Sequence, residues 1–425
     1  MNNNIFEYPK FIQKIFDKLN NENIQTILVG GFVRDSLLVH KNKSNNFKIK
    51  DLDVELYGVK SLSQIKNLLE EFGSLNLVGK SFGVYKLKCN GYDLDFSLPR
   101  KDNKIAKGHR GFSTEITNSL TFKEASSRRD FTINSLGYDT QNKILLDPFH
   151  GREDLQKNLI RAVDLDKFSE DPLRVFRAIV FATRFNFSLD DQLFLECKKL
   201  VQKNALDELA KERIYFELEK IFLKSSTPSK AYELMKSLGI LEYFKPLNRV
   251  NKKEFEAILY SLDSFANTDA SLNKLEKLSI FFAILIHTFE RNEQISLLNN
   301  IVLSKKIINA ALAFNAPSFK KTYSDYELKV LATQINIEHF LLFSQVIYPK
   351  IDKEIFLKLK KRAISLNILH SKQKAFIEGK DLIQEDLKPS KEFKKILELF
   401  YDKQLRNEFN SKETACIALK SYLQK

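Results

Sequence analysis

The stretch Ile27–Asp53, ILVGGFVRDSLLVHKNKSNNFKIKDLD, decides the fold. It begins with the apolar run Ile27–Val29, whose length and composition are typical of a buried strand. The glycine pair Gly30–Gly31 interrupts this strand and leads into a helix predicted from residue 32. Because glycine has no Cβ, backbone N–H groups can approach an anion there, and the helix N-terminus adds partial positive charge. The pattern therefore favours a phosphate-binding turn.

A second strand is predicted at the end of this stretch, over residues 51–56. Its period-two alternation places Asp51, Asp53 and Glu55 on one face. Mg²⁺ prefers a few carboxylates together with water and phosphate oxygens, so two acids facing a glycine turn favour a metal held against a nucleotide triphosphate. The alternative interpretation is an edge strand with solvated acids beside an ordinary turn.

Next comes a predicted hairpin, residues 81–98, with Asn90–Gly91 as its two-residue turn. If the hairpin joins the sheet of residues 51–56, Asp95 can supply a third carboxylate, with Asp93 as the alternative. Residues 100–112, RKDNKIAKGHRGF, show no periodicity and predict a basic loop. Such a loop contacts RNA or nucleotide, or is a plain solvated connection.

Two arginines and an acid follow at Arg128, Arg129 and Asp130. Arginine is suited to bidentate phosphate contacts, which favours phosphate binding. The alternative is that one arginine pairs with Asp130 to fix the turn. Both interpretations can hold, with one arginine for each.

A helix is predicted to begin at Asp171, with this residue as its N-cap. Asp171 and Arg174 are three residues apart, so both can project from one side of the first turn, and Arg177 lies within the same arc. As a rigid pair they could hydrogen-bond the Watson–Crick edge of a base; the alternative is a cap with a surface ion pair. Arg213 is predicted to pair with Glu217 on a later helix, as structural support.

Composition limits the class of protein. The chain has 425 residues, which predicts two to four domains, and its net charge of +14 favours a polyanionic partner, first of all nucleic acid. We expect no membrane span, because no run approaches about 20 apolar residues. Three separated cysteines and the absence of a signal pattern predict a reduced cytoplasm. Strand patterns nearly stop after about residue 151, so a small mixed α/β head should precede an all-helical remainder.

Six segments, taken in order and spacing, resemble the five motifs of the bacterial-type class II tRNA nucleotidyltransferases. These enzymes add CCA, and bacterial poly(A) polymerase is their sibling. The segments are GGFVRD (30–35), DLD (51–53), RRDFTIN (128–134), the DP…G…DL…IR run (147–161), EDPLRVFR (170–177) and ERIYFELEK (212–220). The head segments DFSLPRK (95–101) and GHRGFS (108–113) are also similar. The resemblance covers about residues 25–250, and the rest of the chain carries no matching motif.

The resemblance implies an α+β, polymerase-β-like head over residues 1–150 and an all-α neck, body and tail over 151–225, 226–300 and 301–425. It implies template-independent addition of CCA to the tRNA 3′ end from CTP and ATP, by two-metal transfer with Mg²⁺ and release of pyrophosphate. The tail would bind tRNA; no membrane, haem or other organic cofactor is expected. Alternatives are a poly(A) polymerase, a CC-only or A-only enzyme, or a non-catalytic RNA-binding protein. The SLPR run and the 100–112 loop favour full CCA addition.

The resemblance also implies roles by position. The catalytic metal ligands are matched by Asp51 and Asp53, and a further catalytic carboxylate is matched by Asp95. The triphosphate-binding segment is matched by Gly30, Gly31 and Arg34, and the phosphate and ribose contacts are matched by Arg128, Arg129 and Asp130. The residues that read the base are matched by Asp171 and Arg174, a further nucleotide contact by Arg177, and structural support by Glu170, Glu212 and Arg213. One departure concerns the His-Asp phosphohydrolase domain of some relatives. Here Thr288 follows His287 where an aspartate would stand, so we expect no such hydrolase.

Overall fold

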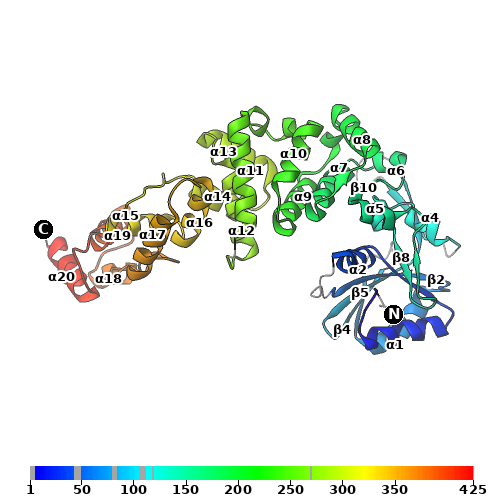
Figure 1. Ribbon diagram of the computed structural model, residues 1–425. Helices are drawn as coiled ribbons and strands as arrows, with labels where there is room; N and C mark the ends of the chain where they lie inside the picture. The colour runs from blue at the N-terminus through cyan, green and yellow to red at the C-terminus, as the bar shows by residue number, and fades with distance from the viewer. Residues whose placement is uncertain are drawn as a thin grey trace. The chain divides into compact units, whose positions relative to one another are not determined.

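The computed structural model describes residues 5–42, 49–78, 84–104, 112–116, 119–268 and 270–424. This part of the chain forms two compact units, Met1–Tyr243 and Phe244–Lys425. The first unit contains the sheet and the helices up to α10, and the second unit is helical (Figure 1). The predicted division at residues 150, 225 and 300 stays a prediction.

The first unit is built on a mixed sheet, which within the described residues has seven strands in the order β3-β4-β5-β2-β1-β8-β9. Strand β2 lies at its centre, antiparallel to β1 and parallel to β5. The strands are β1 (Gln25–Val29), β2 (Asp51–Tyr57), β3 (Ser74–Val78), β4 (Val84–Cys89), β5 (Tyr92–Ser97), β8 (Gly137–Asp139) and β9 (Ile144–Leu146). The predicted strands around Ile27–Val29 and residues 51–56 therefore pair directly with each other.

The helices of the head follow from amphipathic spacing. Helix α1 (Lys10–Asn21) buries Ile12, Ile15, Phe16 and Leu19 and packs against β1. Helices α2 (Gly31–Asn42) and α3 (Leu62–Leu69) complete this layer, and α2 contacts both β1 and β2. Because α2 begins immediately after β1, its N-terminus is fixed at the end of the central strands.

The predicted hairpin is confirmed as β4 and β5, which pair antiparallel around Asn90 and Gly91. Both turn residues have positive φ, +50° and +77°, as a tight hairpin turn requires. The prediction of a loop over residues 100–112 is wrong at its ends. Arg100–Lys104 forms β6, paired antiparallel with β7 (Phe112–Ile116); residues 105–111 lie outside the described residues. The RKDNK segment has no apolar alternation, so pairing by backbone hydrogen bonds left no pattern in its sequence.

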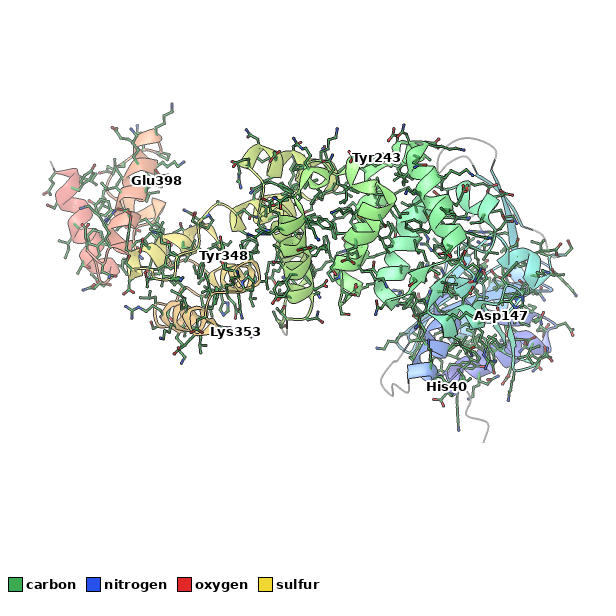
Figure 2. The ribbon with its side chains drawn as sticks, turned by 45° about the horizontal axis from the view of Figure 1, so that its top comes forward. His40, Asp147, Tyr243, Tyr348, Lys353 and Glu398 are labelled. Carbon is green, nitrogen blue, oxygen red and sulfur yellow. The ribbon has the colours of Figure 1, made fainter. Side chains whose placement is uncertain are left out.

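The rest of the first unit is helical apart from one short strand pair, β10 (Leu159–Ile160) with β11 (Ser188–Leu189). Its helices are α4 (Phe122–Ser126), α5 (Gly151–Lys157), α6 (Leu165–Ser169), α7 (Leu173–Phe185), α8 (Asp191–Gln202), α9 (Lys211–Lys224) and α10 (Ser229–Leu238). Asp147, which is labelled in Figure 2, accepts hydrogen bonds from the N–H groups of Gly151 and Arg152 at the start of α5, at 2.7 and 3.0 Å. Helix α7 is largely buried and packs against α9 and α10.

The second unit consists of helices around apolar side chains. Its helices are α11 (Lys252–Ala266), α12 (Lys274–Ile286), α13 (Arg291–Ile301), α14 (Lys305–Phe314), α15 (Asp325–Gln334), α16 (Ile337–Ile347), α17 (Lys353–Ser365), α18 (Gly379–Gln384), α19 (Lys391–Leu405) and α20 (Lys412–Leu423). Helix α12 is buried from Leu278 to Ile286 and packs against α14 and α16. The prediction of a mixed head followed by an all-helical region is thus confirmed.

Among the described residues, no single helix has both the length and the apolar character to cross a membrane. Helices α15 and α16 meet these criteria only when they are taken together, and they bend by 96° at the break between them. This pair meets the criteria by its length and composition alone.

Candidate active site

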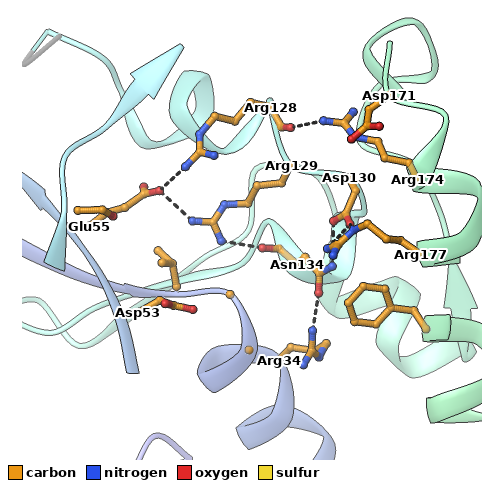
Figure 3. Close-up of a pocket in the computed structure, with 15 residues that line it drawn as sticks. Arg34, Asp53, Glu55, Arg128, Arg129, Asp130, Asn134, Asp171, Arg174 and Arg177 are labelled. Carbon is orange, nitrogen blue, oxygen red and sulfur yellow. Dashed lines mark hydrogen bonds and ion pairs between the residues drawn. The ribbon is translucent and has the colours of Figure 1, made fainter. Parts of the chain in front are cut away.

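A cavity of about 440 Å³ opens in the first unit, between the central strands and helix α7 (Figure 3). Its walls come from the end of β1, the start of α2, β2, the segment 128–134 and α7. The described residues that line it are Val29, Gly30, Gly31, Arg34, Asp53, Glu55, Ser97, Arg128, Arg129, Asp130, Asn134, Asp171, Arg174, Arg177 and Phe181. All nine predicted nucleotide-binding residues are therefore brought together, although they come from widely separated parts of the chain.

The glycine turn lies against the carboxylate of Asp53. Gly30 has a φ of +66°, in the left-handed region, and a Cβ built there would lie 3.3 Å from Asp53 Oδ2 and 3.7 Å from Arg129 Nη1. Helix α2 begins at the next residue, so its first N–H groups, which have no partners within the helix, start beside these two charged side chains. A helix N-terminus in this position favours the binding of a phosphate group.

Gly30→Ala should impair the site in two ways. The left-handed conformation costs a residue with a Cβ about 1–2 kcal/mol of stability, and the new methyl group crowds Asp53 Oδ2. Gly91→Ala is the matched control, because Gly91 also has positive φ but a Cβ there meets nothing within 4 Å. We expect both variants to lose similar stability in urea unfolding and only Gly30→Ala to lose nucleotide binding. Equal nucleotide affinity in the two variants would contradict this role for the turn.

The predicted carboxylates occupy adjacent strands. In the parallel pairing of β2 and β5, Asp53 lies opposite Asp95 and Asp51 lies opposite Asp93. The protein atoms around Asp53 exclude water from its carboxylate and so raise its pKa, and the carboxylate of Asp95 raises this pKa further. Asp95 also forms an ion pair of 2.5 Å with Lys86. Of the predicted acids on these strands, Asp53 lines the cavity, whereas Asp51, Asp93 and Asp95 are not among its lining residues.

Glu55 is a residue of this site to which the sequence reading gave no role. Its side chain is buried, and its Oε1 accepts hydrogen bonds from Arg129 at 2.9 Å and from Arg128 at 3.4 Å (Figure 3). Its Oε2 accepts a hydrogen bond from the hydroxyl of Tyr57, at 3.0 Å. Burial acts to raise the pKa of Glu55, but the two arginines outweigh it and hold that pKa below its usual value. The alternation of residues 51–56 did place Glu55 on the face of Asp53.

Asp130 has a different partner from the one that its sequence neighbours suggested. The idea that Arg128 or Arg129 pairs with it is wrong, because both arginines pair with Glu55. Asp130 Oδ2 instead forms an ion pair with Arg177 of α7, at 2.6 Å. Burial acts to raise the pKa of Asp130, but Arg177 outweighs it, so that the pKa lies below its usual value.

Asn134 extends this network to the glycine turn. Its Nδ2 donates to Asp130 Oδ1 at 2.9 Å, and its Oδ1 accepts from Arg34 Nη1 at 2.6 Å. Arg34 is buried, lies over the rings of Phe181 and Phe185, and has its pKa lowered by burial. A chain of polar contacts thus connects the start of α2 with α7.

The start of α7 presents Asp171 and Arg174 to the cavity, but not as a pair. The N-cap of α7 is Pro172, one residue after the predicted Asp171, but Asp171 Oδ1 does accept a hydrogen bond from the N–H of Leu173 at 3.2 Å. Its carboxylate is held by Arg213 at 3.2 and 2.9 Å, so the predicted Arg213–Glu217 pair is wrong, and Glu217 pairs with Lys220.

Arg174 is held by main-chain groups. It donates to two carbonyl oxygens, that of Lys167 at 2.7 Å and that of Arg128 at 2.9 Å. The predicted rigid pair with Asp171 is therefore replaced by two side chains that are fixed separately. Both residues still line the same cavity.

The residues predicted to give structural support differ in position. Arg213 acts through Asp171, as described above. Glu170 is half-buried, Glu212 is exposed, and neither is among the residues that line the cavity. Their supporting role stays a prediction.

The first unit thus combines a mixed sheet with a cavity that is lined by a glycine turn, acids and arginines. Residues 26–161 match the family described as the poly A polymerase head domain. Residues 186–249 match the family described as the probable RNA- and SrmB-binding site of polymerase A. Both matches confirm the resemblance seen in the motifs over these residues.

Curated relatives and solved structures agree with this assignment. The chain is 38% identical over 228 residues to a CCA-adding enzyme of Buchnera aphidicola subsp. Schizaphis graminum, covering 52% of this chain and 50% of the relative. It is 33% identical over 223 residues to a multifunctional CCA protein of Neisseria gonorrhoeae, again covering 52% and 50%. These matches span about half the length of each relative.

Among solved structures, that of the Bacillus stearothermophilus CCA-adding enzyme in complex with CTP has a TM-score of 0.72 at 20% identity, and the match covers both chains completely. The Thermotoga maritima CCA-adding enzyme complexed with tRNA has a TM-score of 0.63 at 19% identity, over 98% of this chain and 97% of the other. At this identity, the likeness establishes the fold.

Proposed function

We propose that this protein is a tRNA nucleotidyltransferase that adds CCA to the 3′ end of tRNA, using CTP and ATP and releasing pyrophosphate. The observation that carries the proposal is the composition of one cavity. A glycine turn, a helix N-terminus and Asp53 lie at one end, and Asp171 and Arg174 of α7 lie at the other. This arrangement suits a molecule with a polyphosphate at one end and a base at the other, and a relative that is 38% identical over 228 residues is named a CCA-adding enzyme.

The acids of β2 fit a divalent cation, which we propose to be Mg²⁺ held by Asp51 and Asp53. The fit rests on geometry, because Asp51 and Asp53 lie on the same face of β2 and Asp53 Oδ2 lies beside the glycine turn. In addition, the surrounding protein atoms and the carboxylate of Asp95 raise the pKa of Asp53. A bound cation relieves both effects, and carboxylate oxygen is a preferred ligand of Mg²⁺. When bound, the metal would lower the pKa of the RNA 3′-hydroxyl and neutralise phosphate charge. Whether Asp95 joins the two ligands stays a prediction.

The chain's own groups would position the triphosphate. The free N–H groups at the start of α2 bind phosphate oxygens, and the absence of a Cβ at Gly30 allows the close approach. Arg129 Nη1 lies beside the same turn, where it can share the negative charge. Fixed donors of this kind stabilise charge without reorganisation during the reaction.

Base selection would belong to Asp171 and Arg174. Cytosine and adenine each present an exocyclic amine beside a ring nitrogen that accepts a hydrogen bond, whereas uracil and guanine present a carbonyl beside a ring N–H. An acceptor from Asp171 and a donor from Arg174 complement the first arrangement. Since separate partners hold the two side chains, their positions are set before any base arrives.

The full-length protein should be incubated with tRNA that lacks its 3′ CCA, with labelled CTP and ATP supplied separately and together. CCA addition predicts two cytidines from CTP alone and three nucleotides from the mixture. Long products from ATP alone would identify a poly(A) polymerase, and a product that stops after two cytidines, or that takes only adenosine after CC, would identify a partial enzyme. If the RNA is unchanged under every condition, the proposal is wrong. Binding of tRNA by the tail and a cytoplasmic location stay predictions.

A further inference from the structure

We propose that Glu55 is a positioning residue of the metal site, which holds Arg129 away from Asp53 so that this carboxylate stays available to the divalent cation. The inference rests on the proposed function and goes beyond it, because Glu55 belongs to none of the groups placed there on metal, phosphate or base. The proposal explains why an acid is buried on β2 beside the proposed metal ligand Asp53.

The contacts of Glu55 account for both of its oxygens. Oε1 accepts hydrogen bonds from Arg129 at 2.9 Å and from Arg128 at 3.4 Å, and Oε2 accepts one from the hydroxyl of Tyr57 at 3.0 Å. The Glu55 side chain is only 1% exposed, so water cannot replace these partners. Moving a buried carboxylate away from these donors would cost free energy, so Glu55 fixes the guanidinium groups that donate to it.

Arg129 lies within easy reach of Asp53. The position of a Cβ on Gly30 is 3.7 Å from Arg129 Nη1 and 3.3 Å from Asp53 Oδ2, so these two atoms are at most about 7 Å apart, the sum of the two distances. Arg129 is held back by Glu55 and by the carbonyl oxygen of Asn134, to which Nη1 donates at 2.8 Å. In Figure 3, Arg129 points toward Glu55, with Asp53 next to it.

Loss of the negative charge at position 55 would change the balance between the two acids. The Arg129 side chain is only 12% exposed, so its positive charge needs a counter-charge, and Asp53, two residues from Glu55 on the same face of β2, is then the nearby acid. An arginine paired with Asp53 occupies the carboxylate oxygens that a metal would use. Arg129 and the cation therefore compete for Asp53, and Glu55 decides the competition in favour of the cation.

Glu55→Gln tests this directly, since glutamine keeps the shape and one acceptor but removes the charge. We expect the Mg²⁺ concentration for half-maximal nucleotide addition to rise about tenfold or more, as is usual when a partner behind a metal ligand is removed. At saturating Mg²⁺, kcat and the KM for CTP should stay close to the wild-type values. A loss of kcat that excess Mg²⁺ does not restore would overturn the proposal.

Metal binding without nucleotide or RNA gives a readout that does not depend on activity. Titration with Mn²⁺, followed by the electron paramagnetic resonance of the free ion, should show about tenfold weaker binding for Glu55→Gln. In the Arg129→Gln background the competitor is gone, so adding Glu55→Gln should leave the Mn²⁺ affinity unchanged. If Glu55→Gln weakens Mn²⁺ binding equally in both backgrounds, or does not weaken it at all, Glu55 does not act through Arg129.

Asp139→Asn is the matched control. Asp139 is another buried acid of the same sheet, bonded to Gln25 and Asn142 and absent from the lining of the cavity. It should lose stability like Glu55→Gln and keep wild-type Mn²⁺ affinity. Failure of the proposed function would show as a wild-type protein that adds no nucleotide, whereas failure of this inference would show as an active wild type with a Glu55→Gln variant that binds metal equally well.

Discussion

Asp53→Asn should abolish nucleotide addition, with a rate at least about 10³-fold below wild type, because metal ions contribute several kcal/mol of charge stabilisation to such reactions. The substituted amide would keep the size of the side chain but lose the charge that the cation requires. Asp53 carries the largest expected effect because, of the three acids predicted to be catalytic (Asp51, Asp53 and Asp95), it is the one that lines the cavity. Single-turnover addition of CMP to tRNA that lacks CCA is the measurement.

The same variant should retain its fold and its tRNA affinity, measured by thermal unfolding and by gel shift. Removal of a crowded negative charge relieves repulsion from Asp95, so no loss of stability is expected. Asp139→Asn serves again as a carboxylate control, with activity expected at the wild-type level. Nucleotide addition by Asp53→Asn within tenfold of wild type would exclude Asp53 from the chemistry.

Asp171→Asn should relax the choice of base. The amide has a donor where the carboxylate has an acceptor, so it can accept uracil or guanine, which present a carbonyl at that position. A good bidentate base contact is worth about 1–3 kcal/mol, so discrimination between CTP and UTP should fall by about 10- to 100-fold. Rates of single-nucleotide addition with each of the four triphosphates provide the measurement.

Arg213→Ala should change selectivity in the same direction as Asp171→Asn, since Arg213 holds the Asp171 carboxylate at 2.9 Å. Arg249→Ala is the matched control, because Arg249 forms an ion pair of 3.0 Å with Glu293 within the second unit. It should leave the preference for CTP over UTP at its wild-type value. Unchanged discrimination in both Asp171→Asn and Arg213→Ala would remove this end of the cavity from base selection.

Strands and turns that depend on the pattern of adjacent residues could be predicted from the sequence. The alternation of residues 51–56, the Asn90–Gly91 turn and the glycine pair after Val29 each identify an element from adjacent residues. Once β2 and β5 were both identified, the proximity of Asp53 and Asp95 depended only on the two strands pairing, and the observed register places them opposite each other. The mixed head and the helical remainder could be predicted because strand patterns nearly stop after about residue 151.

Side-chain pairing was the part that sequence reasoning missed. Arg129 and Glu55 are 74 residues apart, and Arg213 and Asp171 are 42 residues apart, so no helical or strand period relates them. Sequence reasoning chose the neighbours Asp130 and Glu217 instead, because short-range spacing was the information at hand. The fold decides which charges meet, and it buries Glu55 where two arginines converge.

All the described residues that line the cavity lie between positions 29 and 181, well inside the first unit. The matches to the two families likewise end at residue 249. A substitution in the helices after residue 249 therefore changes none of the described residues that line the cavity.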